Sequence, residues 1–278
     1  MILFKQKKEG IMKTITLNEM KKVLDDTLSD LKSGKIKNEN LIFFGDDGIG
    51  KKAIIGEWFE KHASEIKYWD LRPTAFYEEV NGILREALKD GKPQYCFGDN
   101  IMEDFSKGDR ILYLPTINLY PPEVNQPFNE IFKNRTYHNP ISNIDHDLHK
   151  LGLVIATAYD EDTFDGEGAH PIPELKDCST LYKVVPSVKE FKEYFDERVN
   201  RFDDELPEKI ELFKKILSSP HFRFISEKGE HFSSVYFMML FDMTESVDKE
   251  EILSHVDNMG ACGAKTKAMF EKIFEEID

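Results

Sequence analysis

The sequence has few cysteines, with only three in 278 residues. Cys96, Cys178 and Cys262 lie far apart and show no short metal-ligand spacing. Disulfide frameworks and zinc modules both need several cysteines at suitable spacings, so neither is predicted. The scarcity of cysteine favours a reducing, cytoplasmic compartment.

Long apolar runs are also missing. The longest, such as residues 235–241, are far shorter than the ~20 residues that a membrane-spanning helix requires. The opening letters MILFKQKK lack the apolar centre of a signal peptide. We therefore expect a soluble protein without a membrane partner.

Basic charge is in deficit. The chain carries 37 Lys and Arg residues against 52 Asp and Glu residues, a formal net charge of −15. Such a surface repels a polyphosphate backbone at long range, so no nucleic-acid partner is expected. Because 40% of the residues are hydrophobic, the chain is able to build a substantial core.

Apolar spacing predicts a helix over residues 17–31, followed by strands that alternate with helices or loops. Such alternation is typical of a mainly parallel sheet covered on both faces. We therefore predict an α/β three-layer domain with a five-stranded sheet. The strand candidates are residues 41–44, 66–71, 110–114, 151–158 and 180–185.

The strand pattern ends at Pro186, after which the chain reads as helices. We therefore expect residues 1–186 to form the α/β domain and residues 187–278 a smaller, all-helical lid. Within the lid, the letters SVYFMMLF predict a largely buried helix. Its expected core residues are Val235, Phe237, Met238 and Phe241.

A phosphate-binding loop is predicted between the first strand and the next helix. The letters GDDGIGK, residues 45–51, match the pattern G-x-x-x-x-G-K in the required strand-to-helix context. Glycines let backbone N–H groups approach phosphate, and the lysine reaches its terminal groups. An ordinary glycine-rich turn is the alternative. The candidate nucleotide-binding residues are Gly45, Gly48, Ile49, Gly50, Lys51, Lys52 and Ala53.

Lys52 stands where this pattern normally continues with the Ser or Thr that binds magnesium. Its ammonium could replace part of the cation's charge and allow ATP or ADP to bind without Mg²⁺. Asp46 and Asp47 place negative charge on the same loop. The two lysines could equally close the loop on these aspartates with no ligand, and both alternatives stay open.

The letters LYLPTINLYPPEVNQPFNEIFKNR, residues 112–135, resemble the second nucleotide motif of the MoxR-like branch of the AAA+ ATPases. Further segments resemble that branch in the expected order and extend the resemblance over residues 17–277. They are GLVIATAYD for the sensor-1 strand, HPIPELKDCSTLYKVVP for the arginine-finger segment, SSPHFRFIS for the sensor-2 helix start and VDNMGACGAKTKAMFEKI for the closing helix.

The resemblance also shows which active-site groups are replaced. Pro115 and Thr116 stand at the positions of the acidic pair that supports magnesium and activates water. The sensor-1 asparagine is matched by Ala158 or Tyr159. The arginine-finger position falls on Cys178, and the sensor-2 position falls on His221, with Arg223 as a partial substitute.

These replacements imply a degenerate ATPase with no catalytic residues and no metal site. The predicted function is a non-hydrolysing scaffold or regulatory subunit that assembles with other proteins, including an intact AAA+ ATPase, in an oligomer. One alternative is an active ATPase that remodels a protein partner, with Asp160 or Glu123 supplying the acid. Another is a switch that binds nucleotide without turnover.

Three further features of the sequence lead to predictions. His138, Asp145, His146, Asp147 and His149 are able to ligate a transition metal, but a solvated hairpin or loop is the simpler interpretation. Arg72 is either an anion contact or the partner of nearby acids, and residues 158–170 are expected to form a long loop. Pro127 should delay or bend the helix of residues 124–135, whose apolar side includes Val124, Phe128, Ile131 and Phe132.

Overall fold

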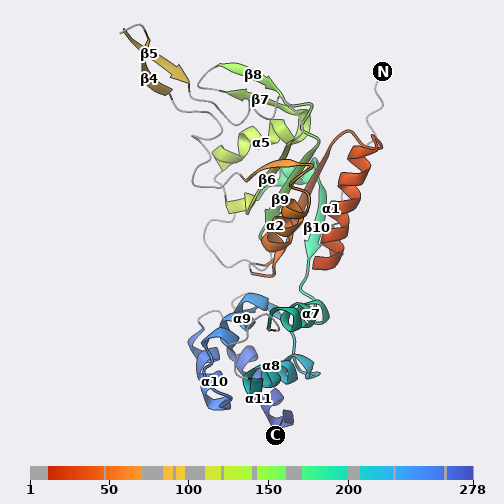
Figure 1. The fold of residues 1–278 in the computed structure, drawn as a ribbon, viewed down its shortest axis with the longest axis vertical. Coiled ribbons are helices and arrows are strands. Elements are labelled where there is room, and N and C mark those ends of the chain that lie inside the picture. The colour runs from red at the N-terminus through yellow and green to blue at the C-terminus, as the bar shows by residue number, and fades with distance from the viewer. Residues whose placement is uncertain are drawn as a thin grey trace.

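The computed structural model describes residues 12–46, 48–70, 84–89, 92–97, 110–119, 122–139, 143–160, 171–199, 207–227, 230–259 and 262–277. Arg72 and most of the expected loop, residues 161–170, lie outside these ranges. Figure 1 shows a sheet with helices on its faces, connected to a group of helices that contains the C-terminus.

A parallel sheet of six strands forms the centre of the first part (Figure 1). Its order is β1-β10-β2-β9-β6-β3, and every neighbouring pair is parallel. The strands are β1 (Lys13–Ile15), β2 (Glu39–Phe44), β3 (Lys67–Asp70), β6 (Arg110–Leu114), β9 (Leu153–Ala158) and β10 (Thr180–Val184). The predicted α/β fold with a parallel sheet is confirmed, but the sheet has six strands and not the predicted five. The additional strand is β1, which the sequence pattern missed.

Both faces of the sheet are covered because consecutive side chains of a strand point to opposite faces. Leu41 and Phe43 of β2 pack with helices α1 (Leu17–Lys32) and α2 (Lys51–Lys61) in one apolar cluster. Ile42 and Phe44 pack in a second cluster with helices α5 (Pro122–Asn134) and α6 (Pro173–Asp177). Strands buried on both faces explain the continuous apolar runs in the sequence.

Local interactions determine where helix α1 begins and ends. Thr16 accepts a hydrogen bond from the Glu19 N–H, and the Glu19 carboxylate accepts one from the Thr16 N–H. This reciprocal pair is a capping box. After the helix, Gly34 has φ +73°, a backbone conformation that glycine adopts without steric cost.

Helix α5 begins at Pro122, so Pro127 does not delay its start, and the other alternative, a bend at Pro127, stays a prediction. Pro127 is the sixth residue of the helix, and its missing N–H removes only one hydrogen bond near the helix start. The buried side chains Phe128, Ile131 and Phe132 all follow it. Their packing on the sheet compensates for that loss.

Two antiparallel hairpins extend from the first part (Figure 1). They are β4 (Leu84–Lys89) with β5 (Lys92–Phe97), and β7 (Thr136–Asn139) with β8 (Ile144–Asp147). The second hairpin carries four of the five candidate metal ligands. The simpler interpretation of that segment, a hairpin, is therefore confirmed.

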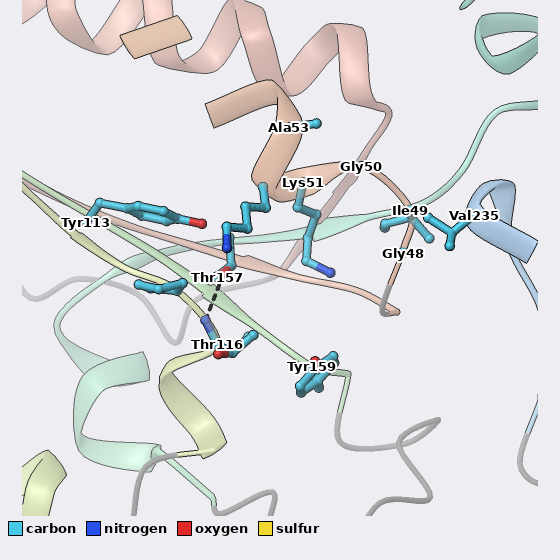
Figure 2. Close-up of a pocket in the computed structure, with 13 residues that line it drawn as sticks. Gly48, Ile49, Gly50, Lys51, Ala53, Tyr113, Thr116, Thr157, Tyr159 and Val235 are labelled. Atoms are coloured by element: carbon cyan, nitrogen blue, oxygen red, sulfur yellow. Dashed lines mark hydrogen bonds between the residues drawn. The ribbon is translucent and has the colours of Figure 1, made fainter. Parts of the chain in front are cut away.

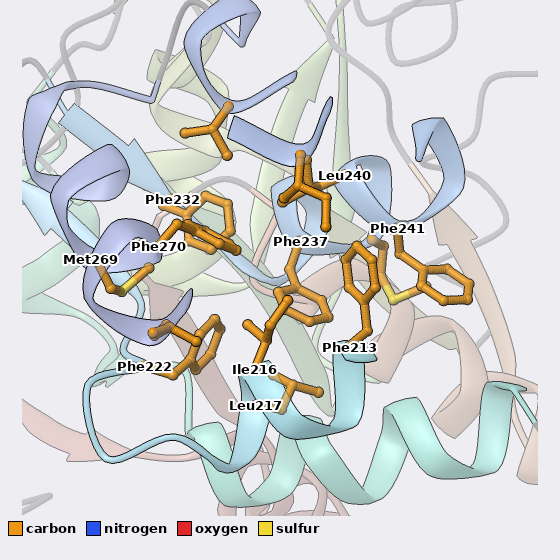
Figure 3. Close-up of a cluster of buried hydrophobic side chains, with 14 of the residues drawn as sticks. Phe213, Ile216, Leu217, Phe222, Phe232, Phe237, Leu240, Phe241, Met269 and Phe270 are labelled. Atoms are coloured by element: carbon orange, nitrogen blue, oxygen red, sulfur yellow. The ribbon is translucent and has the colours of Figure 1, made fainter. Parts of the chain in front are cut away.

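The helical lid has its own apolar cluster, in which phenylalanines predominate (Figure 3). Phe237 is fully buried and meets the rings of Phe191, Phe195, Phe213 and Phe222 edge-on at centroid distances of 5.4–5.6 Å. Edge-to-face contacts are a favourable arrangement for aromatic rings. The helices are α7 (Val188–Val199), α8 (Pro207–Ser218), α9 (Ser234–Met243), α10 (Lys249–Asn258) and α11 (Ala264–Ile277).

The lid also contains a short antiparallel hairpin, β11 (Ile225–Glu227) with β12 (Glu230–Phe232), so the expectation of an all-helical lid is corrected. Both strands have only three residues, too few for a period-two pattern to be recognised. Among the helices of the described part of the chain, none is both long enough and apolar enough to span a bilayer.

Candidate functional site

The candidate site is built around the loop between β2 and α2. Gly45 has φ +154°, and a Cβ added there would lie 2.6 Å from the carbonyl oxygen of Val184. Gly50 caps α2 with φ +100°, again outside the region favoured by L-residues. Glycine is therefore required at both ends of this turn by backbone geometry alone.

Lys51 is turned toward the loop that precedes it. Its Nζ donates hydrogen bonds of 2.6 Å to the carbonyl oxygens of Gly45 and Asp46. The residue is only 8% exposed although it carries an ammonium group. Lys51 therefore ties the first two residues of the loop to the start of α2.

A cavity of about 440 Å³ opens beside the loop (Figure 2). Its walls come from the loop and the start of α2, from the ends of β6 and β9, and from the start of α9. Such a volume lies in the range of small-molecule sites. The lining residues are Gly48, Ile49, Gly50, Lys51, Lys52, Ala53, Tyr113, Pro115, Thr116, Thr157, Ala158, Tyr159 and Val235.

Six of the seven candidate nucleotide-binding residues line this cavity. Gly45 is the exception: it sits at the end of β2, where its N–H donates to the carbonyl of Ala158 at 3.2 Å. Its role in the described structure is to let the chain turn beside β10. The structure therefore brings six of these residues to one cavity, and their role in nucleotide binding stays a prediction.

The wall opposite the loop is fixed by hydrogen bonds between two strand ends. The N–H of Thr116 donates to Thr157 Oγ1 at 2.9 Å (Figure 2), and Thr116 has φ +50°. Asn118, in the short helix η1 (Ile117–Leu119), exchanges two 3.0 Å bonds with the backbone of Tyr159. Asn118 therefore holds the segment after β6 against the end of β9.

The lid reaches the cavity through Val235 rather than through the residues expected from the sequence. His221 forms a 3.0 Å ion-pair contact with Glu276, and neither His221 nor Arg223 lines the cavity. Val235 was expected in the lid core, but it is 45% exposed and lies beside Gly48 and Ile49 (Figure 2). It is the second residue of α9, a position that sequence spacing alone did not connect to the loop.

Two other residues that the sequence singled out do not face the cavity. Asp160 is 6% exposed, and its carboxylate pairs with Lys183 Nζ at 2.5 Å. Cys178 follows α6 and packs against the apolar cluster on that side of the sheet. The side chain of Glu123 lies outside the described part of the structure.

The five candidate metal ligands on and after the β7–β8 hairpin do not converge. His138 pairs with Asp145 at 2.7 Å, and His149 pairs with Asp147. Hydrogen bonds from the backbone and side chain of His149 lower the pKa of Asp147. Across the described ranges, no group of three or more His, Cys, Asp or Glu side chains is placed to hold a metal ion.

The charged residues in the described lining of the cavity are all basic. Among its 13 described lining residues, Lys51 and Lys52 are the only charged ones, and none is Asp, Glu or Arg. In a partly enclosed space, two ammonium groups without a facing carboxylate favour an anion. The described lining therefore suits a phosphate-bearing ligand and contains no carboxylate ligand for magnesium.

The lid and the loop are in direct contact at Gly48. Ser234 Oγ donates to the carbonyl of Gly48 at 2.9 Å. A Cβ added to Gly48 would lie 3.0 Å from Val235 Cβ and 3.1 Å from Ser233 Oγ, and Gly48 has φ +69°. This glycine therefore allows the start of α9 to rest on the loop.

Gly48→Ala should lower the free energy of unfolding by about 1–2 kcal/mol, because alanine resists this left-handed backbone and crowds α9. Chemical denaturation measures the change. Gly56→Ala is the matched control, since an added Cβ at Gly56 meets nothing within 4 Å. In the interior of α2 that change should stabilise by about 0.5–1 kcal/mol. Equal effects of the two substitutions would contradict the described contact.

Comparison with known proteins gives similarity of structure only. The sequence matches no protein-family profile and no curated protein. The RuvB Holliday junction branch migration motor of Thermotoga maritima is 12% identical, with a TM-score of 0.46 over 93% of this chain and 68% of that chain. NtrX of Brucella abortus in complex with ATP is also 12% identical, with a TM-score of 0.44 over 69% of this chain and 44% of that chain. The NtrX complex with ADP gives 13% and 0.42.

The aligned region spans less than half of the NtrX chain. At these identities and TM-scores the likeness carries no argument about ligand, partner or activity. Such arguments depend on the cavity and on the residues that line it.

Proposed function

We propose that this chain is a AAA+-type subunit of the MoxR-like kind that does not hydrolyse ATP and works by assembling with other proteins. One observation carries the proposal. The wall that faces Lys51 and Lys52 presents Pro115, Thr116 and Tyr159, and the lid presents Val235. None of these side chains is able to hold a divalent cation as a carboxylate does, or to act as a general base.

Hydrolysis needs several groups that act together. A cation neutralises charge on the transferred phosphate, an acidic residue or amide positions the water, and an arginine stabilises the transition state. Loss of an arginine finger alone costs about 10³–10⁵ in rate. The described cavity has a cationic loop but lacks these partners, so it favours binding over turnover.

Positions that build the fold differ from positions that carry charge in the transition state. Asn118 still joins β6 to β9, and the glycines still shape the loop. A chain that has the residues that build the fold, but lacks the charged residues that catalyse hydrolysis, is suited to a scaffold or regulatory role. We also propose a domain division at residue 186, because the apolar clusters on the sheet end at Val184 and the lid cluster begins at Val188.

The proposed ligand is ATP or ADP bound without Mg²⁺. Calorimetric titration with ATP should give binding in EDTA that is at least as tight as binding in Mg²⁺, because the lysines supply the only charges in the described lining. Binding that requires Mg²⁺ would contradict metal-free recognition.

The assembly role has a separate test. The purified chain is mixed with an intact MoxR-like ATPase from the same host, and the mass of the complex is measured by light scattering after size-exclusion chromatography. A stable mixed oligomer is the expected result. If both proteins elute at their separate masses with and without nucleotide, the regulatory-subunit proposal fails.

A nucleotide-binding switch is the second candidate, and the contact between α9 and Gly48 favours it. Ser234 is bonded directly to the loop that would surround a phosphate. A ligand that moves this loop must also move the start of α9 or break that bond. Protection of the α9 amides from hydrogen exchange should therefore change when ATP is added, and unchanged protection in the ligand-bound protein would argue against the switch.

A further inference from the structure

The two adjacent lysines of the cavity have different surroundings. Lys51 Nζ is engaged by two loop carbonyls at 2.6 Å, and the residue is 8% exposed. Lys52 is exposed, and its side chain forms no hydrogen bond or ion pair in the described part of the chain. The motif assigns ligand contact to the first lysine, whereas the geometry leaves the second one available.

Two other lysines on α1 and α2 are held in ion pairs, Lys21 with Glu57 and Lys61 with Asp25, although the chain carries a net charge of −15. Lys52 is not held in such a pair within the described part of the chain, and it differs from the equally unpaired Lys22 of α1 in that it lines the cavity. The first turn of α2, where Lys52 lies, contains no acidic residue. An anion in the cavity would therefore meet a cation that does not have to leave an ion pair.

The uncharged residues on the other side of the cavity are a second reason to consider Lys52 as a contact for an anion. Pro115, Thr116 and Thr157 provide no carboxylate that would bind a divalent ion or pair with Lys52. The negative charge of a phosphate chain in this cavity needs a cation to balance it. Lys52 lines the same cavity as these residues and is able to supply that charge.

We propose that Lys52 is the cation that contacts the phosphate groups of a metal-free nucleotide, while Lys51 acts as an internal tie that keeps the loop closed. This assignment gives Lys52 the phosphate contact that the motif predicts for Lys51. It rests on the nucleotide-binding part of the proposed function. The ligand class is a nucleoside di- or triphosphate in its Mg²⁺-free form.

The test uses the full chain and ATP in EDTA, with affinity measured by calorimetry and stability by thermal unfolding without ligand. Lys52→Gln should weaken ATP binding at least about tenfold and leave the unfolding temperature unchanged, because an exposed, unpaired side chain is removed. Lys52→Arg should retain affinity within about threefold, since it keeps the charge. Lys22→Gln, an exposed lysine on α1, is the control and should change neither quantity.

Lys51→Gln should lower the unfolding temperature without ligand, because both loop carbonyls lose their charged donor. It should weaken ATP binding less than Lys52→Gln does. Wild-type affinity of Lys52→Gln would overturn the proposal. So would a larger loss of affinity in Lys51→Gln with an unchanged unfolding temperature.

Failure of this assignment is distinguishable from failure of the proposed function. Phosphate release and mixed-oligomer formation are measured on the wild-type chain and do not depend on which lysine contacts a ligand. A wild-type chain that binds no ATP in EDTA or Mg²⁺ overturns the lysine assignment and leaves the scaffold role standing. ATP hydrolysis by the wild-type chain would overturn only the proposal that the chain does not hydrolyse ATP.

Discussion

Purified protein incubated with ATP and Mg²⁺ is expected to release phosphate no faster than the protein-free control. The expected rate is at least about 10³ below that of an AAA+ ATPase with all its catalytic groups. The reason is that the cavity wall after β6 contains Pro115 and Thr116, while Asp160 does not line the cavity and is paired with Lys183. A coupled phosphate-release assay measures the rate.

Contaminating ATPases are the main source of false activity, so Lys51→Ala is assayed beside the wild-type protein. Equal background rates in both preparations agree with the proposal. Turnover that is present in the wild type and lost in Lys51→Ala would show that this cavity hydrolyses ATP. The proposal would then be replaced by an active ATPase whose acid comes from another segment or a neighbouring subunit.

Arg135→Ala is expected to lower the free energy of unfolding by about 3 kcal/mol, a large effect for a single residue. Arg135 is 3% exposed, and its guanidinium donates three hydrogen bonds, all to backbone carbonyl oxygens. The acceptors are Leu151, Ile131 and Glu39, at 2.9–3.1 Å. Alanine would leave all three carbonyls without this donor, and urea denaturation measures the loss.

Burial of the Arg135 guanidinium has a cost in stability that depends on pH. Desolvation lowers the pKa of Arg135 to about 10, although the nearby Glu39 carboxylate raises it. Because the folded pKa lies below the ordinary value, burial of the charge costs stability at every pH below about 10. That cost falls only as the pH rises through the folded pKa, since the folded state then loses the proton first. At neutral pH the residue is charged, and its three carbonyl contacts offset the cost.

Arg223→Ala is the matched control because Arg223 is exposed. Its removal should change the free energy of unfolding by less than about 0.5 kcal/mol. A similarly small change for Arg135→Ala would mean that water or a shifted backbone satisfies the three carbonyls. The described role of Arg135 in joining α5 to the start of β2 would then be wrong.

Local sequence determined most strands of the central sheet and the loop that follows β2. The strands of the sheet were recognisable because residues buried on both faces give unbroken apolar runs, as in β2 and β9. The glycine-rich loop between β2 and α2 was recognisable because its glycines, which adopt positive backbone φ angles, lie within a few residues of one another. These properties depend on short segments, so the pattern alone contained them. The three-residue strands β1, β11 and β12 were missed because they are too short for any periodic signal.

Tertiary structure decided the features that join distant segments. Val235 reaches Gly48 from 187 positions away, so no spacing rule connected the start of α9 with the loop. The burial of Arg135 depends on carbonyls from three separate segments. Lys51 and Lys52 are adjacent and chemically identical, but one is buried against loop carbonyls and the other is exposed. Sequence determined which groups lie near the loop, and the folded chain decided which of them are buried and which line the cavity, because that depends on packing between elements far apart along the chain.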